Sequence, residues 1–239
     1  MNNLIKLSRS TVEKYITCPR CCVLDKKFKI KPPSLPFTLN IAVDNLCKNE
    51  FDYYRKIKQP HPLFLENNIN AIPFYHEKID EWRSNFKGLR YISPEKNYNF
   101  GGAIDDVWQK SNGELIVADV KATSKNNFDW HETFNKYEYP KAYKRQLEMY
   151  QWLLMKNGFK VAKEAYLLYF NGSKNEQFFN QKLKFEAHLI KLDCCNDWVE
   201  SKVEETVDLL RSNIFPKPSF NCEICSYLKK RWTLSQTLN

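Results

Sequence analysis

The chain has 239 residues, 43% of them hydrophobic and 15% aromatic, with only six glycines, a composition that excludes a disordered or fibrous protein. No apolar run approaches the roughly 18 to 20 residues that span a bilayer, so we expect a cytoplasmic protein without a membrane partner. The formal net charge is +9, and all of the excess lies at the two ends. Residues 1–40 carry eight Lys/Arg against two acidic residues, and residues 215–239 carry four against one.

This charge distribution is open to two interpretations. If the fold brings the two ends together, they form one basic surface suited to a polyanion such as nucleic acid. Alternatively, the terminal lysines only increase solubility. The charge pattern does not decide between a binding surface and a solvated one.

The N-terminal region is predicted to be helical and then extended. Ser10 and Glu13 fit a capping box, in which each side chain bonds to the backbone N–H of the other residue. This predicts a short helix that runs into Cys18. Residues 31–36 contain three prolines, which favours a rigid, extended connection.

A longer amphipathic helix is predicted over residues 38–58. Its stripe, at spacings of four, three and four, consists of Val43, Cys47, Glu50 and Tyr54. Glu50 is a carboxylate on an otherwise apolar stripe, which indicates either a functional acid or a partly buried residue at the edge of the core. Residues 59–96 are rich in proline and asparagine and predict a loop with a short helix at 77–86.

Two strands are predicted at 100–109 and 114–121, joined by a three-residue loop that ends at Gly113, where a left-handed backbone is wanted. The remaining predicted elements are a helix at 139–156, strands at 165–171 and 183–192, and a helix at 198–212. This order of helices and strands predicts an α/β (α+β) fold with a mixed sheet flanked by helices.

The predicted hairpin places two acidic residues opposite each other. With a three-residue loop, the register sets Asp105 across from Asp119, with Cβ atoms about 4.5 to 5.5 Å apart. Lys121 follows two residues later and therefore emerges on the same face. Facing carboxylates repel unless a cation or a shared proton lies between them. Asp-x-Lys by itself is common on surface strands, but the apolar run at 115–118 makes an incidental charge cluster a weaker explanation.

Three short motifs follow one another along the chain: Gly102-Ala103-Ile104-Asp105, Asp119-Val120-Lys121 and Gln146-Leu147-Glu148-Met149-Tyr150. Their order and spacing resemble those of the PD-(D/E)XK nuclease superfamily, in its RecB-like branch. The cysteine-bearing ends resemble the iron–sulfur nucleases of that branch, including CRISPR-associated exonucleases. The resemblance spans the chain from Cys18 to Cys225 and implies a restriction-endonuclease-like fold.

In that superfamily two acidic residues bind Mg²⁺ or Mn²⁺, which positions a water for attack on a phosphodiester. The resemblance therefore implies that Asp105 and Asp119 are metal ligands, together with the carbonyl of Val120. It also implies that Lys121 orients the attacking water.

Two helices are expected to complete this site. The superfamily places an acidic or histidine residue on an upstream helix at the metal, and Glu50 is the candidate for it. Gln146 and Tyr150 lie one helical turn apart, and the resemblance places such a pair beside the site, in contact with substrate or with the lysine. Packing of this second helix on the sheet would also explain their positions.

Four cysteines form two CxxC pairs about 200 residues apart, Cys18 with Cys21 and Cys222 with Cys225. In a chain expected to be cytoplasmic, two such pairs indicate a metal site rather than disulfides, since four thiolates complete a tetrahedral shell. The resemblance favours a 4Fe-4S cluster, whereas Cys-Pro-Arg-Cys also looks like a zinc knuckle, so both stay open. The common pattern has three cysteines near the end, so Cys21 or Cys22 must supply the missing ligand.

We therefore expect one nuclease domain over 1–239, with terminal segments 1–37 and 213–239 forming a shared cysteine metal-binding subdomain. The expected activity is metal-dependent hydrolysis of DNA at single strands or duplex ends, by an exonuclease rather than an endonuclease. A helicase or another DNA-processing protein is the expected partner.

Two alternatives belong to other classes. One is a catalytically inactive nucleic-acid-binding module with a structural zinc site, against which the intact Asp105, Asp119 and Lys121 argue. The other is a structural zinc protein in which the two aspartates have no function.

Overall fold

The computed structural model describes residues 4–237, which form two compact units. The terminal unit comprises the chain up to Leu35, the segment Ile92–Phe100, and the chain from Asp197 onward. The central unit comprises Pro36–Tyr91 and Gly101–Asn196. The single nuclease domain over 1–239 and its terminal subdomain stay predictions, and residues 1–3 and 238–239 of both lie outside the described residues.

The central unit is built on a five-stranded sheet of order β2-β5-β6-β7-β8. Its strands are β2 (Ala71–Pro73), β5 (Asp106–Lys110), β6 (Leu115–Thr123), β7 (Glu164–Gly172) and β8 (Phe185–Asp193). β6 and β7 run parallel, and the other neighbouring strands are antiparallel. This mixed sheet with flanking helices confirms the predicted fold class.

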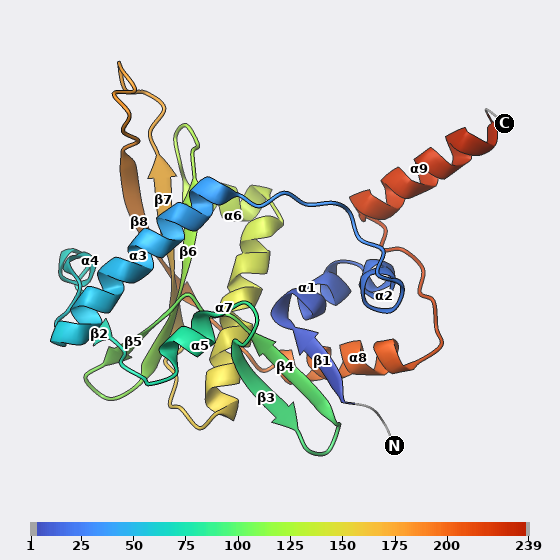
Figure 1. Ribbon diagram of the computed structural model, residues 1–239, viewed down its shortest axis with the longest axis horizontal. Helices are drawn as coiled ribbons and strands as arrows, with labels where there is room; N and C mark the ends of the chain where they lie inside the picture. The colour runs from blue at the N-terminus through green and yellow to red at the C-terminus, as the bar shows by residue number, and fades with distance from the viewer. Residues whose placement is uncertain (1–3, 238–239) are drawn as a thin grey trace. The chain divides into compact units, whose positions relative to one another are not determined.

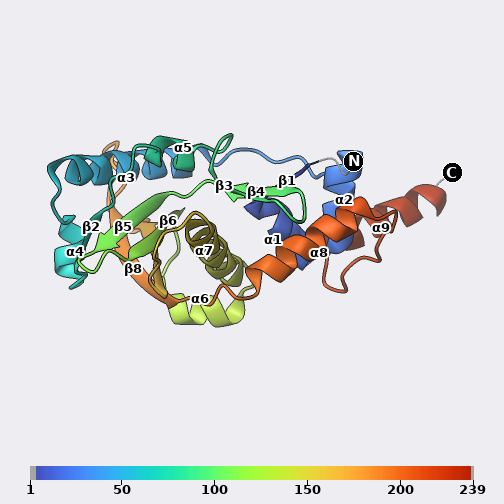
Figure 2. The same cartoon turned by 90° about the horizontal axis from the view of Figure 1, so that it is seen from below.

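The two longest helices of this unit, α3 (Thr38–Ile57) and α7 (Tyr139–Lys156), cover opposite faces of the sheet (Figures 1 and 2). Successive residues of a strand point to opposite faces, so alternate residues of β6 face the two helices. Ile116 and Ala118 pack in the same core cluster as residues of α3, whereas Asp119 contacts α7. The shorter helices are α4 (Pro62–Glu66), α5 (Ile79–Arg83) and α6 (Trp130–Lys136).

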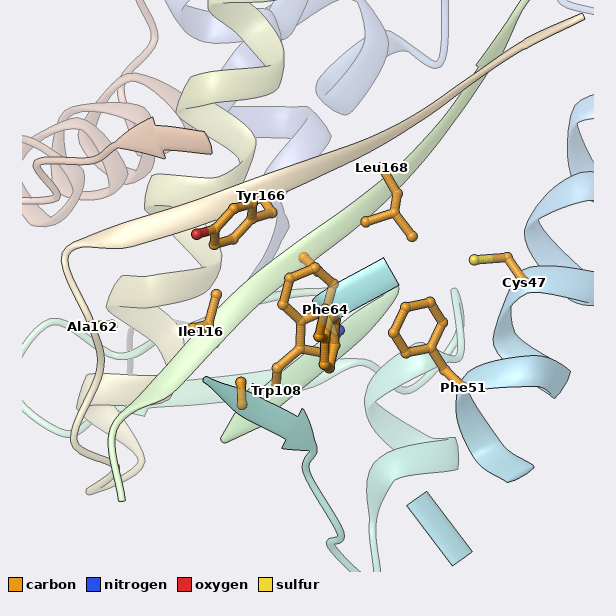
Figure 3. Packing of buried hydrophobic residues seen from close by; sticks show 10 residues of the cluster. Cys47, Phe51, Phe64, Trp108, Ile116, Ala162, Tyr166 and Leu168 are labelled. Atoms are coloured by element: carbon orange, nitrogen blue, oxygen red, sulfur yellow. The ribbon is translucent and has the colours of Figure 1, made fainter. Parts of the chain in front are cut away.

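Aromatic side chains fix α3 to the sheet (Figure 3). Trp108 of β5 is fully buried, and its ring centroid lies 5.8 Å from that of Phe51 and 4.4 Å from that of Phe64. Ile116 and Leu168 fill the same cluster from β6 and β7. Burial of each such large side chain contributes about 1.5–3 kcal/mol. The cluster therefore holds α3 firmly beside β6, which carries Asp119.

The terminal unit is mainly helical. It contains β1 (Ile5–Ser8), α1 (Arg9–Thr17), α2 (Pro19–Phe28), α8 (Val199–Arg211) and α9 (Glu223–Thr237). β1 belongs to a three-stranded sheet of order β1-β4-β3, with β4 (Tyr98–Gly102) and β3 (Leu89–Ser93). α1 packs on α8, where the Tyr15 hydroxyl donates to Glu205 Oε2 at 3.0 Å. Within residues 4–237 no helix has both the length and the apolar character needed to cross a membrane.

Three sequence predictions of local structure differ from the structure. The first helix is capped by Ser8, whose hydroxyl accepts the Thr11 N–H, and not by Ser10 with Glu13. The predicted strand at 100–109 is broken at residues 103–105, and its halves β4 and β5 belong to different sheets. The predicted loop at 59–96 contains β2, α4 and β3 besides the expected helix, which spans Ile79–Arg83 as α5. Short elements escape prediction because tertiary pairing, rather than local periodicity, stabilises them.

Candidate active site

The predicted hairpin register is confirmed. Asp106 pairs with Ala118 as the sequence predicts, and Asp105 lies in the bend just before this first pair of the ladder. Lys110 N–H donates to the Glu114 carbonyl at 2.9 Å, and Gly113 has φ +81°. The three-residue loop therefore sets the register of the ladder, which ends next to the two aspartates.

Asp105 lies in the bend just before β5 and is held from two sides. Its Oδ2 accepts the backbone N–H of Val120 at 3.0 Å, and its Oδ1 accepts Lys48 Nζ at 3.0 Å. Burial disfavours the ionised carboxyl, but the ammonium groups of Lys48 and Lys121 and the Val120 N–H keep the pKa of Asp105 below its usual value. Asp105 is thus a partly buried carboxylate, tied to the backbone next to Asp119.

Asp119 sits in the middle of β6 and is only 1% exposed. Its Oδ1 accepts Gln146 Nε2 at 2.7 Å, and Gln146 Nε2 also lies 3.1 Å from the Tyr150 hydroxyl. Burial raises the pKa of Asp119 to about 7; Lys121 opposes the rise, and the neighbouring Asp105 adds to it. The structure therefore brings the two predicted helix residues, Gln146 and Tyr150, to the predicted carboxylate.

Lys121 forms an ion pair with Asp119, and its Nζ lies 3.5 Å from the Val120 carbonyl oxygen. The same Nζ lies 4.7 Å from the centroid of the Tyr143 ring, a cation–π contact. Burial lowers the pKa of Lys121, but Asp119 and Asp105 outweigh it and raise the pKa above its usual value. Lys121 is therefore placed as a hydrogen-bond donor to the Asp119 carboxylate.

Glu50 is not brought to the carboxylates. Its side chain is 60% exposed and lies 3.3 Å from His61 Nε2. The side of α3 that faces the sheet follows Cys47, Phe51 and Arg55, all buried, rather than the predicted stripe through Glu50. The predicted stripe is wrong because the inner side of α3 carries two charged residues, Lys48 and Arg55, which also pair with aspartates from outside the helix.

The acidic residue that α3 does bring to the site is Asp44. Lys48 Nζ lies 2.6 Å from Asp44 Oδ2 and 3.0 Å from Asp105 Oδ1, so one ammonium joins both carboxylates. Burial and the charge of Asp105 raise the pKa of Asp44, while Lys48 opposes the rise. Sequence reasoning missed Asp44 and Lys48, although their i,i+4 spacing is typical of a paired helix face.

A network of two arginines and two aspartates contacts the backbone of Asp105. Arg83 Nε donates to the Asp105 carbonyl at 3.0 Å, and Arg83 Nη2 lies 3.0 Å from Asp106 Oδ2. Arg83 Nη1 also contacts both carboxylate oxygens of Asp52 at 2.8 Å. Arg55 pairs with Asp106 from the other side. The planar guanidinium of Arg83 therefore bonds to the backbone carbonyl of Asp105, a candidate metal ligand, and pairs with the carboxylates of Asp106 and Asp52.

The donor set of this site fits a hard divalent cation. Asp105 lies close enough to Asp119 to raise the pKa of its carboxyl, and the Val120 carbonyl is the adjoining oxygen. All of these donors are oxygens, which Mg²⁺ and Mn²⁺ prefer. The ammonium groups of Lys48 and Lys121 meet the same carboxylates, which shows that the site stabilises positive charge.

The four predicted cysteines form a cluster in the terminal unit. The sulfur atoms of Cys18, Cys21, Cys222 and Cys225 all lie within 4.8 Å of one another, and no other group of three or more candidate metal ligands within residues 4–237 is as close. Cys21 Sγ lies 3.5 Å from the sulfurs of both Cys222 and Cys225. Cys22 instead points its thiol at the Thr11 carbonyl, so Cys21 and not Cys22 joins the cluster. The thiols are free, and such a set suits a metal ion or metal cluster.

Comparison with known proteins gives one family. The family described as the PD-(D/E)XK nuclease superfamily matches residues 38–229. A solved structure named SSO0001 is 18% identical, with a TM-score of 0.42 over 95% of this chain and 84% of that one. A second, described as a candidate exonuclease from Eubacterium rectale, is 13% identical, with a TM-score of 0.43 over 93% of this chain and 87% of that one. No curated protein matches the chain.

Proposed function

The chain belongs to the PD-(D/E)XK nuclease superfamily, and we propose that it is a divalent-metal-dependent deoxyribonuclease acting on single strands or duplex ends. The observation that carries the proposal is the convergence of Asp105, Asp119 and Lys121, with Gln146 and Tyr150 behind Asp119. Nucleases of this superfamily use divalent metal ions, which fits the oxygen donors of the site.

The proposed metal ligands are Asp105, Asp119 and the carbonyl of Val120, with Asp44 in the role first assigned to Glu50. Bound Mg²⁺ or Mn²⁺ would supply Lewis-acid activation of a water and neutralise charge on the phosphate. The protein's own contribution is to fix these oxygens before substrate arrives. Gln146 does this for Asp119, because its amide donates to Oδ1 at 2.7 Å.

Lys121 is proposed to donate hydrogen bonds from Nζ to the attacking water and to the phosphate oxygen that gains negative charge. Its ammonium is paired with Asp119, so the role proposed for Lys121 is to orient the water and not to take its proton. The cation–π contact with Tyr143 limits where Nζ can move. Donors aimed in advance at developing charge are worth about 2.7–4 kcal/mol each in characterised enzymes.

Exonuclease rather than endonuclease action, and DNA rather than RNA as substrate, rest on the resemblance to cysteine-bearing RecB-like exonucleases. The competing hypothesis is a catalytically inactive nucleic-acid-binding module with a structural zinc site. The two hypotheses differ in one respect: only the nuclease needs Asp105 and Asp119 to be able to hold a divalent ion. A helicase or other processing partner stays a prediction.

The test is Mg²⁺- or Mn²⁺-dependent degradation of end-labelled single-stranded DNA by the wild type, Asp119→Ala and Lys121→Ala. We expect the wild type to release labelled product and both variants to lose at least about 100-fold in rate. Covalently closed single-stranded circles should resist an exonuclease, and a matched RNA strand tests the sugar preference. Equal cleavage by wild type and variants would refute the site, and metal-independent binding alone would favour the inactive module.

For the cysteines we propose a single tetrahedral Zn²⁺ over a 4Fe-4S cluster. Sulfurs about 2.3 Å from one zinc lie about 3.8 Å apart in a tetrahedron. The contacts of 3.5 and 3.9 Å among Cys18, Cys21, Cys222 and Cys225 are close to that spacing. A cluster binds each thiolate through a separate iron and needs the sulfurs farther apart. The proposed role is to tie the start of α2 to the start of α9.

A further inference from the structure

A series of tyrosine rings leads away from the candidate active site along the start of α7. Tyr143, whose ring meets the Lys121 ammonium, lies 5.6 Å from Tyr139 between ring centroids, and Tyr139 lies 5.6 Å from Tyr137. Tyr139, Tyr143, Gln146 and Tyr150 are spaced by four, three and four residues, so they share one helical stripe. We call Tyr137, Tyr139 and Tyr143 the tyrosine tract. It continues the stripe that holds Asp119.

A second lysine lies over the far end of the tract. Lys125 Nζ lies 5.0 Å from the Tyr137 centroid and 5.2 Å from the Tyr139 centroid, and it donates to the Tyr139 hydroxyl at 2.5 Å. No carboxylate within residues 4–237 forms an ion pair with Lys125. Its charge is therefore not neutralised inside the protein, unlike that of Lys121.

The position of Lys125 is built into the sheet. The Asn171 side chain of β7 accepts the Lys125 N–H at 2.8 Å and donates to the Lys125 carbonyl at 3.0 Å. Asn171 is 8% exposed, and this partly buried two-way contact extends the link between β6 and β7 beyond Thr123. A lysine on a loose loop would not be fixed in this way.

The outer end of the tract is accessible to solvent. Tyr137 is 43% exposed and, with Lys125 and Lys174, lines a hollow of about 370 Å³. The acidic groups of the hollow, Asp129 and Glu132, are engaged: Asp129 caps α6, and Glu132 lies 3.9 Å from Lys136. The hollow thus offers an aromatic surface beside Lys125 and Lys174, with the carboxylates of Asp129 and Glu132 on the same lining.

We propose that the tyrosine tract and Lys125 bind the unpaired nucleotides of the substrate strand next to the scissile phosphate. Aromatic rings stack on bases of any sequence, and a lysine neutralises the intervening phosphate, which is the usual chemistry of single-strand binding. A duplex keeps its bases stacked inside and cannot use the rings in this way. The inference rests on the proposed nuclease function and deepens it by assigning the single-strand subsite.

The test measures binding of fluorescein-labelled oligothymidylate by anisotropy in an Asp119→Asn background, in which the probe should not be degraded. Tyr137→Ala and Tyr139→Ala should each weaken binding about 5- to 150-fold, the range for loss of one stacked base. Tyr139→Phe keeps the ring and should bind within about threefold of the parent. Lys125→Gln should lower the slope of log affinity against log salt by about 0.7. Tyr75→Ala, an exposed tyrosine next to the edge strand β2, is the matched control and should change nothing.

A blunt hairpin duplex serves as the second probe and should bind all tyrosine variants and the parent alike. The inference is overturned if the alanine variants bind oligothymidylate like the parent, if hairpin binding falls equally, or if the parent fails to bind. Failure of the proposed function looks different, because wild type and Asp119→Ala would then degrade labelled DNA at the same rate. Loss of cleavage in Asp119→Ala with unchanged binding in the tyrosine variants would leave the nuclease standing and remove the subsite.

Discussion

Asp44 and Glu50 lie six residues apart on α3. Alanine substitutions at the two positions test which of these acidic residues belongs to the site, Asp44 as in the structure or Glu50 as predicted from the sequence. Asp44 reaches Asp105 through Lys48, with contacts of 2.6 and 3.0 Å. Glu50 is 60% exposed and meets only His61 among the described residues, at 3.3 Å. We expect Asp44→Ala to reduce nuclease activity and Glu50→Ala to leave it unchanged.

The size of the Asp44 effect follows from its distance to the ligands. If Asp44 acts only by holding Lys48 against Asp105, its loss should cost about 10- to 100-fold in activity or metal affinity, as for other groups that support metal ligands. Direct coordination of the metal would make the loss larger. Removal of Asp44 also relieves repulsion with Asp105, so the unfolding midpoint should stay equal or rise. Glu50→Ala breaks a contact of an exposed side chain and should cost about 0–1 kcal/mol.

The assay is release of label from single-stranded DNA over a titration of Mn²⁺, with thermal unfolding of each variant measured in parallel. Asp44→Ala should need more metal for half-maximal rate, and Asp44→Glu should recover part of the loss. Activity of Glu50→Ala within about twofold of wild type is the expected control. Equal losses in both alanine variants, or none in Asp44→Ala, would refute the assignment of Asp44.

Three further outcomes are expected. Asp106→Ala leaves Arg55 and Arg83 without their buried partner and should lower the free energy of unfolding by about 3–5 kcal/mol. For a chain of this size the melting temperature should fall by about 6–20 °C, measured by thermal unfolding followed by circular dichroism. Cys222→Ser should lose about one zinc per chain by elemental analysis; a brown wild type with absorbance near 400 nm would instead establish a cluster. Burial lowers the pKa of His61 in the folded chain below the value of about 6.5 that the imidazole has in the unfolded chain. As the pH drops from about 6.5 through the native pKa, the unfolded chain takes up the imidazole proton first, so the stability of the folded chain should fall. His61→Gln should flatten that slope in unfolding midpoints measured between about pH 5 and 7.

The parts of the site that lie on one hairpin could be predicted from sequence. The loop ending at Gly113 fixes the register of β5 against β6, which ends at Asp106 opposite Ala118, next to Asp105 and Asp119. Turn length and a period of two are local properties, so no long-range contact is needed to obtain them. The grouping of the four cysteines could also be predicted, since each CxxC motif offers two candidate ligands from one turn. In the structure the terminal unit brings the two pairs together.

The choice between Asp44 and Glu50 could not be made in this way. A stripe chosen by hydrophobicity excludes charged residues, yet the inner side of α3 carries Lys48 and Arg55 as well as Phe51. Both cations are neutralised by aspartates from the segment 105–106, which lies more than 45 residues farther along the chain. Their burial is affordable only because those partners exist. Within α3 the sequence shows only the spacings of Lys48 with Asp44 and of Arg55 with Asp52, and not these partners from the segment 105–106.

The tyrosine tract lies between these two cases. Spacings of four, three and four through Tyr139, Tyr143, Gln146 and Tyr150 were present in the sequence, so the stripe that identifies the active-site helix could have been extended toward its N-terminus. Helical spacing could not show that the ammonium groups of Lys121 and Lys125 lie against these rings, since both lysines come from the end of β6. Four residues separate the two lysines, and in an extended chain that spacing returns them to the same face. The helix stripe and the end of the strand are thus joined by contacts between ammonium groups and tyrosine rings, which is the arrangement expected of the proposed single-strand subsite.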